Sequence, residues 1–419
     1  MTIQESAIIS LLANLDEDSF QNRYKFNPSD FTRNRKLTFS SVVGMILRMV
    51  KQSLQIACNW LGDLKEGDPA SKQAFCKARQ KISPECFKEF HEDGLRVNYT
   101  EAPKGGLWNG FRLIACDGST LRLPESKELA DEFGRWPTRE GVSKSPPIAR
   151  ISEFTDMATK LVLSGRIAPC KVSEEVLAEE QLTEVVRKMR ALGQKDILFV
   201  YDRGYPSEKF INQHIELGVD FIFRLPRNFN NEVKKVYEQK IPESFFLRED
   251  WPLLRVVQFE LSSGKEELLF TSLNDEKRFS QEMLSEVYHG RWSSMEEGYK
   301  RQKITMQLEN FSGKTVTAIR QEYWATLTVG NLIEMGCIEI EGHWIPGKIP
   351  ERHVNRSVIF GSMRDATIEV IFGIISPREY QKKFKRSAQR SMLKVRPNRN
   401  YSREGVGKPK NHHVYRRSC

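Results

Sequence analysis

Three carboxylates in the chain are placed as the ligands of a metal site would be. Asp117 and Asp202 each end a short apolar run, at residues 113–116 and 197–201, and Glu296 lies in a segment with helical character. Carboxylate oxygens are the ligands that Mg²⁺ prefers in proteins, and Mn²⁺ accepts the same ligands. Two such ions could activate a water or a 3′ hydroxyl and stabilise the leaving oxygen during attack on phosphorus. Each aspartate is also closely followed by glycine and could instead simply begin a turn.

The segments around these residues alternate between apolar runs and helical patterns. Near-continuous apolar runs are typical of buried strands that helices cover on both faces. Strands are predicted at 113–116, 151–166 (a pair), 197–201 and 221–225, and a helix at 174–192. Sites in open α/β sheets form at the carboxyl ends of strands. We therefore predict an α/β fold in which the sheet positions Asp117 and Asp202.

Helical patterns dominate the first hundred residues and β patterns return after residue 228. Apolar residues from Phe39 to Trp60 recur at the spacing of one helix face, and further helices are predicted at 71–82 and 85–95. Strands at 256–261 and 267–272 have a hairpin turn signal at Gly264 between them. We predict a helical N-terminal domain at 1–104, a catalytic core at 105–337 with a β-rich insertion at about 228–276, and a helical C-terminal region at 338–419. The N-terminal domain could bind DNA or could simply brace the rest of the chain.

The basic charge is concentrated at the C-terminal end. The chain carries a net charge of +10, and residues 378–419 contain fourteen Lys and Arg residues and two acidic ones. This basic tail, with Tyr380, Phe384, Tyr401 and Tyr415 interleaved, suits contact with the phosphates of a polyanion. It could equally be a solubilising, disordered end.

Composition excludes several classes of protein. With 39% hydrophobic and 29% charged residues, the chain is typical of a globular protein. No apolar run approaches the roughly 18 residues of a membrane span, and the first twenty residues lack a secretory pattern, so we expect a cytoplasmic protein without a membrane partner. The seven cysteines are scattered and include no Cys-x-x-Cys pair, which indicates neither a disulfide framework nor a zinc site.

Three motifs together resemble the insertion-sequence-4 family of DDE transposases. They are Cys116-Asp117-Gly118-Ser119-Thr120, Tyr201-Asp202-Arg203-Gly204-Tyr205, and a helix motif containing Tyr288, Arg291, Glu296 and Lys303. The helix motif, followed by the similar segment 308–314, is the most specific. Residues 31–37 and the basic tail are also similar, so the resemblance covers nearly the whole chain.

This resemblance implies an RNase H-like core in which Asp117, Asp202 and Glu296 bind two Mg²⁺ ions. It also implies that Tyr288, Arg291 and Lys303 contact DNA phosphates, for which Arg offers a bidentate fork and Lys a point charge. A solvated helix face is the alternative.

Three further residues are weighed as DNA contacts. Arg203, next to the second aspartate, is predicted to contact DNA. Trp292 and Trp251 could stack on an extruded base, although burial in the core is the preferred interpretation for both.

The chain departs from the family at one point. The family signature is Tyr-x2-Arg-x3-Glu-x6-Lys, whereas four residues separate Arg291 from Glu296. Because each residue of a helix turns by about 100°, the extra residue would swing Arg291 off the face of Glu296. We expect a bulge at Ser293–Ser294; a helix that begins after Arg291, or an impaired protein, are the alternatives. Met295 stands at the family spacing and Glu297 is a second nearby acid, but Glu296 keeps its spacing to Lys303.

The sequence thus predicts a DDE transposase that cleaves the ends of its own insertion sequence and joins them to target DNA. Its expected partners are duplex DNA, as terminal inverted repeats and target, and a second copy of itself in the synaptic complex. Two alternatives remain open: an RNase H-like nuclease that cuts without joining, and a transposase-derived DNA-binding protein that no longer cuts.

Overall fold

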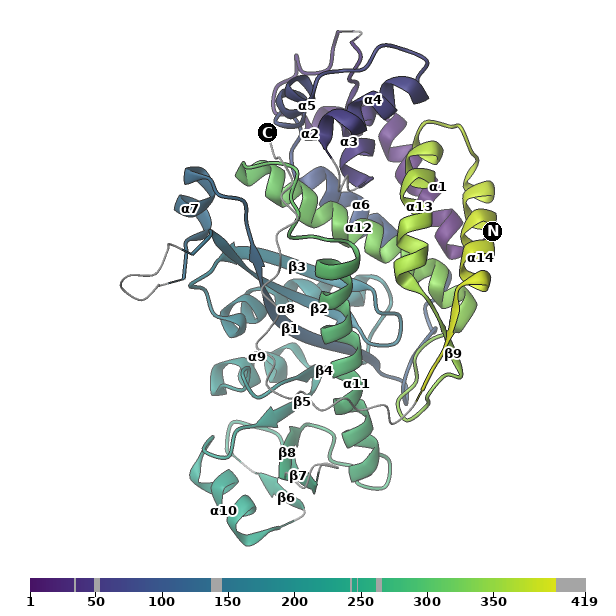
Figure 1. The fold of residues 1–419 in the computed structure, drawn as a ribbon. Coiled ribbons are helices and arrows are strands. Elements are labelled where there is room, and N and C mark those ends of the chain that lie inside the picture. Colours follow the sequence, from purple (N-terminus) through teal and green to yellow (C-terminus); the bar gives the residue numbers. More distant parts are fainter. Residues whose placement is uncertain are drawn as a thin grey trace.

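The computed structural model describes residues 1–33, 35–48, 53–136, 145–241, 243–246, 248–260 and 266–396. The predicted helical start is confirmed: α1 (Ile3–Asp16), α2 (Asp18–Tyr24), α3 (Phe39–Leu47), α4 (Leu54–Leu64), α5 (Lys72–Arg79) and α6 (Glu85–Glu101) gather at the top of Figure 1. The single helix predicted from Phe39 to Trp60 is instead two helices, with residues 49–52 outside the described part. Hydroxyls of Thr38 and Ser71 accept from backbone N–H groups and cap α3 and α5.

The centre of the molecule is one mixed sheet in the order β3-β2-β1-β4-β5-β8-β7-β6. Its strands are β1 (Arg112–Arg122), β2 (Ile148–Asp156), β3 (Val162–Pro169), β4 (Ile197–Tyr201), β5 (Asp220–Leu225), β6 (Glu243–Phe246), β7 (Leu254–Glu260) and β8 (Glu266–Thr271). β1 runs antiparallel to β2 and parallel to β4, and β4 runs parallel to β5. This arrangement confirms the predicted α/β class with a mixed sheet.

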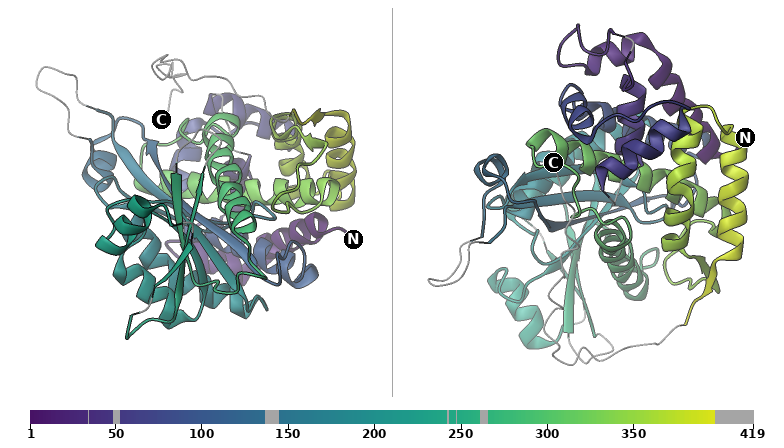
Figure 2. Two further views of the ribbon diagram at one scale, coloured as in Figure 1. Left: turned by 90° about the horizontal axis from the view of Figure 1, so that it is seen from below. Right: turned by 45° about the horizontal axis from the view of Figure 1, so that its top comes forward.

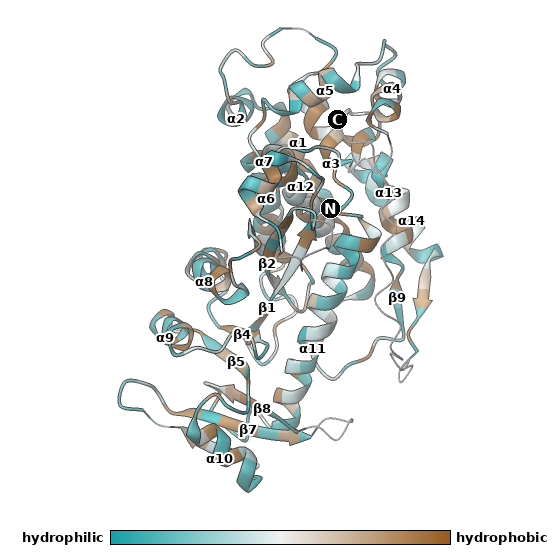
Figure 3. Cartoon of the chain, turned by 60° about the vertical axis from the view of Figure 1, so that its left-hand side comes forward, coloured by the Kyte–Doolittle hydropathy of each residue, from teal (hydrophilic) through white to brown (hydrophobic). Residues whose placement is uncertain are grey.

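Helices cover both faces of the sheet. Ser164 of β3 bonds to Gln181 of α8 (Glu174–Ala191), which lies near α9 (Glu208–Leu217). On the opposite face, Glu153 of β2 accepts hydrogen bonds from Gln302 and from Tyr323 of α12 (Val316–Glu341). This second layer also contains α11 (Gln281–Lys300), and both layers can be followed in Figure 2. Figure 3 shows hydrophobic strands inside and hydrophilic outer sides on α8 and α9.

The predicted β-rich segment extends the central sheet. β7 and β8 pair as the predicted hairpin strands, and residues 261–265 between them are outside the described part. The expectation of β structure from residue 228 was wrong at its start, where α10 (Asn231–Gln239) forms. Asn230 caps this helix by accepting from Val233 N–H, and the buried Val233 and Val236 lie one turn apart.

The start of the basic tail is a packed helix. The last described elements are β9 (Arg352–Val354), α13 (Arg356–Ile371), α14 (Pro377–Arg390) and β10 (Met392–Lys394). Earlier in the chain, the short helix α7 (Lys127–Phe133) lies at the edge of the sheet. Tyr380, Phe384 and Ala388 of α14 are buried, and Phe384 packs on Gly336 of α12. The alternative of a disordered end was therefore wrong for 378–396, while 397–419 lie outside the described residues. Within the described part of the chain, no helix is long and apolar enough to cross a membrane.

Candidate catalytic site

The sheet brings Asp117 and Asp202 to one place. β1 and β4 are parallel neighbours that pair through Ala115 and Val200, and each aspartate lies two residues beyond its strand's member of that pair. The Asp117 carboxylate accepts from its neighbour Gly118 N–H at 2.9 Å, and that of Asp202 from the next backbone N–H at 2.8 Å. The strand predicted to end at residue 116 continues to Arg122, so Asp117 lies within β1, whereas Asp202 directly follows β4. The side-chain-to-backbone bonds hold both carboxylates close to rigid backbone.

Arg291 of α11 lies between the two aspartates. Its guanidinium is 3.6 Å from Asp117 and 3.5 Å from Asp202. The Tyr288 hydroxyl donates to the Asp202 carboxylate at 3.0 Å, and Arg224 of β5 reaches the same carboxylate at 3.4 Å. The buried Nε of Arg291 has no hydrogen-bond partner among the described residues. The two carboxylates therefore already share one positive charge.

The two aspartates differ in their affinity for a proton. Burial raises the pKa of Asp117 to about 6, against the opposing effect of Arg291, while the negative charges of Glu174 and Asp202 add to the rise. Burial also acts to raise the pKa of Asp202, but Arg291, the neighbouring backbone N–H and Tyr288 outweigh it, so this pKa is lowered. Asp202 is thus the carboxylate that stays ionised most readily.

Glu296 does not join the aspartates in this structure. Its side chain is 32% exposed and pairs with Lys300 at 3.0 Å, one turn along α11. Met295, only 2% exposed, lies on the buried side instead. Among the described residues, no group of three His, Cys, Asp or Glu side chains is placed to hold a metal ion.

The bulge expected at Ser293–Ser294 was wrong, because α11 continues as an unbroken α-helix from Gln281 to Lys300. A wide turn follows it, the π-helix η1 (Arg301–Thr305). The widened turn therefore lies after Glu296, where Lys303 contacts β1.

Other residues of the helix motif reach the first strand. Lys303 Nζ donates to Ser119 Oγ and to the Thr120 carbonyl, both at 2.6 Å. The Tyr299 hydroxyl donates to the Asp117 carbonyl at 2.7 Å. The chain from Tyr288 to Lys303 thus lies along the second half of β1 and beside the residue that follows β4.

The two tryptophans behave differently. Trp251 is 6% exposed, in line with the preferred core interpretation, but Trp292 is 56% exposed on α11, so that interpretation was wrong for it. Arg203 is also exposed, beside Asp202. An exposed ring and an exposed guanidinium are both available to a nucleic acid.

Two functional neighbours were missed by the sequence analysis. Arg224 ion-pairs with Glu267 of β8 as well as with Asp202, and its signal was a lone charge in the apolar run 221–225. Glu174, at the start of α8, lies over Gly118, where an added Cβ would meet its Cγ at 2.2 Å. No sequence pattern links Glu174 to that position.

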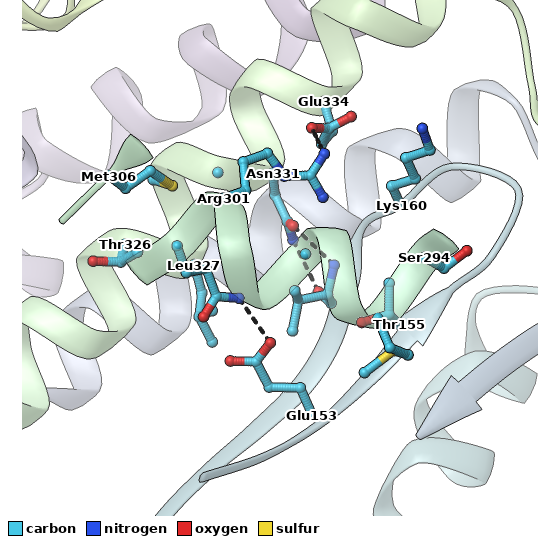
Figure 4. Close-up of a pocket in the computed structure, with 15 residues that line it drawn as sticks. Glu153, Thr155, Lys160, Ser294, Arg301, Met306, Thr326, Leu327, Asn331 and Glu334 are labelled. Carbon is cyan, nitrogen blue, oxygen red and sulfur yellow. Dashed lines mark hydrogen bonds and ion pairs between the residues drawn. The ribbon is translucent and has the colours of Figure 1, made fainter. Parts of the chain in front are cut away.

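A small cavity of about 30 Å³ lies beneath α11 and η1 (Figure 4). It has room for about one water molecule. Glu153 lines it, and burial raises the pKa of this carboxyl to about 7, against hydrogen bonds from Gln302 and Tyr323. Arg301 in its wall ion-pairs with Glu334 of α12. These contacts fasten η1 to the sheet and to α12.

Comparisons with known proteins agree on one kind of domain. The family described as "Transposase DDE domain" matches residues 108–332, more than half of the chain. A stretch of 119 residues is 25% identical to "Putative transposase InsZ" of Escherichia coli (strain K12). That match covers 27% of this chain and 38% of the length of InsZ.

Solved structures with similarity to the chain include two transposase complexes. A piggyBac transposase in a synaptic complex with hairpin DNA matches at a TM-score of 0.49 and 11% identity, covering 96% of this chain and 88% of that one. A Mos1 transposase in a paired-end complex with the left transposon end matches at a TM-score of 0.19 and 11% identity, covering 45% and 59%. By its match over residues 108–332, the chain belongs to the family of proteins with a transposase DDE domain.

Proposed function

We propose that this protein is a transposase of the insertion-sequence-4 subfamily, which cleaves the ends of its own element and joins them to target DNA. The observation that carries the proposal is the placement of the Asp117 and Asp202 carboxylates on either side of the Arg291 guanidinium, just beyond the last parallel pair of β1 and β4, within a transposase DDE domain.

The donor set fits a hard divalent cation. Carboxylate oxygens of Asp117 and Asp202 both face the positively charged guanidinium of Arg291. Asp117, Asp202 and, after a change in α11, Glu296 would hold two Mg²⁺ ions, for which Mn²⁺ could substitute. Bound there, the ions would activate the attacking oxygen and stabilise the leaving oxygen at phosphorus.

The chain's own side chains would hold the DNA end. Arg291, released from the aspartates, would offer its fork to the phosphate beside the scissile bond, with Tyr288 and Lys303 on the same helix as further contacts. Trp292 would stack on a base and Arg203 would contact the backbone. Because two ends must be held together for joining, a homodimer on duplex DNA is the expected assembly, with residues 1–104 and the basic tail as further DNA contacts.

One observation favours a second candidate. Met295, rather than a carboxylate, faces the sheet beside Arg291, and a chain fixed in this arrangement would bind DNA without cutting it. The non-cutting DNA-binding protein therefore remains the alternative.

The test uses a DNA fragment that carries the element's terminal repeat, with Mg²⁺. The parent protein should nick this end and join a pre-cleaved end to target DNA, whereas Asp117→Asn should do neither and keep its DNA affinity. Asp131→Asn, at an exposed position of α7, is the matched control and should behave as the parent. Nicking by Asp117→Asn at the parent rate would refute the site; nicking without joining would identify a nuclease.

A further inference from the structure

Met295 and Glu296 compete for one face of α11. Counting from Arg291, Met295 lies about 40° and Glu296 about 140° around the axis of a regular α-helix. Met295 is accordingly buried on the face from which Arg291 reaches the aspartates, and Glu296 turns outward to Lys300. The carboxylate is therefore one residue out of register with Asp117 and Asp202.

Both ends of the segment that contains Glu296 are fastened to the sheet. Arg291 is held by the two aspartates and Lys303 by Ser119 and Thr120 of β1. On an unbroken α-helix Lys303 would lie about 120° from Arg291 and could not share its face. The wide turn η1, in which Met306 N–H bonds to the Arg301 carbonyl five residues back at 2.8 Å, takes up the extra residue.

We propose that this wide turn moves along the helix, from Arg301–Thr305 to the stretch between Arg291 and Glu296, and thereby brings Glu296 to the aspartates. The inference rests on the proposed function, because it treats Asp117 and Asp202 as metal ligands. The move rotates residues 296–300 by about 100° and leaves Arg291 and Lys303 where they are. Glu296 then takes the place of Met295, about 40° from Arg291.

The packing beneath this segment is incomplete in a way that permits the move. Met295, Gly298 and Gln302 line the cavity under the helix. The buried Oε1 of Gln302 has no hydrogen-bond partner among the described residues. Native cores rarely leave a buried polar group without a hydrogen bond. Repacking around Gln302 therefore breaks no hydrogen bond to this oxygen. Methionine is also the apolar side chain that adapts most easily to a new position.

The two positions of the wide turn differ in what they offer a divalent cation. With the turn at η1, the two aspartates face Arg291, and Asp202 also faces Arg224, and these positive charges repel a further cation. With the turn upstream, a third carboxylate joins them and compensates for the like charge. A ligand shifts an equilibrium toward the state it binds better, so a hard divalent cation would select the upstream position. The move breaks the partly exposed pair of Glu296 with Lys300, which contributes little to stability. It also displaces the buried Tyr299 from the Asp117 carbonyl, and cation binding has to offset the loss of that hydrogen bond.

Two single-residue deletions fix the helix in the two registers. Deleting Ser294 removes the extra residue before Glu296 and makes an unbroken helix with the carboxylate on the Arg291 face. Deleting Glu297 removes it after Glu296 and keeps Met295 on that face. In both deletion proteins, Lys303 lies about 20° from Arg291 around the axis of an unbroken helix. The two proteins also have the same chain length. Calorimetric titration with Mn²⁺ should show at least tenfold tighter binding than the parent for the Ser294 deletion and tenfold weaker for the Glu297 deletion. Equal affinities in the two folded proteins would overturn the proposal.

A pair of substitutions gives the same test without changing chain length. Met295→Glu combined with Glu296→Gln places a carboxylate on the Arg291 face with the wide turn still at η1. This double variant should bind Mn²⁺ at least tenfold tighter than Glu296→Gln alone; equal binding would overturn the proposal even if a deletion protein fails to fold.

Failure of the proposed function can be told apart from failure of this inference. If Asp117→Asn binds Mn²⁺ as the parent does, the aspartates are not metal ligands and both proposals fall. If Asp117→Asn loses Mn²⁺ while the two deletion proteins bind it equally, the metal site stands and only the moving turn is refuted.

Discussion

The guanidinium of Arg291 lies 3.5 Å from the carboxylate of Asp202 and links α11 to the end of β4. Its guanidinium lowers the pKa of both aspartates, but with the other groups around them the pKa of Asp117 is raised overall and that of Asp202 is lowered. This asymmetry leads to measurable differences between the two aspartates.

Asp117→Asn should stabilise the fold at neutral pH. The pKa of Asp117 is raised from 3.8 to about 6, mainly by burial, so the folded protein binds this proton more tightly than the unfolded chain does. Ionised Asp117 therefore lowers stability above pH 6 and has no such effect below pH 3.8. At pH 7.5 the variant should gain on the order of 2 kcal/mol in denaturant unfolding, with the gain vanishing toward pH 4. No gain at pH 7.5 would contradict the prediction.

Asp202→Asn should have the opposite effect. Burial disfavours ionised Asp202, but Arg291, the Arg203 backbone N–H and Tyr288 outweigh it and lower its pKa. The ionised carboxylate thus contributes stability that is present above pH 3.8 and is lost as pH falls through the lowered pKa. The variant should be less stable than the parent at pH 7.5, and the two should converge in acid. Stabilisation by both asparagines would show that Arg291 does not distinguish the aspartates.

Trp292→Ala should affect DNA and leave the fold intact. Because this ring is 56% exposed, its removal should change the free energy of unfolding by no more than about 0.5 kcal/mol. Loss of base stacking should weaken binding of a cleaved DNA end by about 1–3 kcal/mol in fluorescence anisotropy. Trp251→Ala is the control: from its 6% exposed position it should destabilise the fold by about 3–5 kcal/mol. Unchanged DNA affinity for Trp292→Ala would exclude it as a contact.

The outer side of α14 should contribute to the salt dependence of DNA binding. Lys382, Lys385 and Arg386 are exposed, and none forms an ion pair with another described residue. Replacing all three with Gln should flatten the slope of log affinity against log salt by about 0.9 for each phosphate that is no longer neutralised. Lys383→Gln is the matched control, because that lysine already pairs with Glu369 at 2.7 Å. Equal slopes for the triple variant and the parent would show that the helix only packs.

Removal of residues 397–419 tests the rest of the basic tail. This stretch contains six Lys and Arg residues and one Glu, and the cut leaves the packed α14 in place. If the tail neutralises phosphates, the salt slope should fall again by about 0.9 per phosphate, whereas thermal stability should not change. A slope equal to that of the full chain would restrict the DNA-binding surface to the described part.

The sequence by itself determined the sheet and the first two carboxylates. A near-continuous apolar run identified each strand, and the parallel pairing of the two strands brings the aspartates that follow these runs together. The run before Asp117 did not mark the end of its strand, because β1 continues to Arg122. The same approach failed at α10, where a cap at Asn230 and two valines one turn apart outweighed the β pattern. For α14, the spacing of Tyr380, Phe384 and Ala388 contained the signal of a packed helix, but the charge of the tail obscured it.

Only the tertiary structure decided which side chains of α11 face the sheet. Spacing along the chain shows that one residue is extra, but not where it is taken up, because a wide turn can lie at several positions in a helix. Contacts of Arg291 with the aspartates and of Lys303 with β1 fix the two ends and set the turn at Arg301–Thr305. That choice turns Met295 inward and Glu296 toward Lys300. Side-chain directions on a helix depend on where its ends are held, and those constraints come from distant parts of the chain.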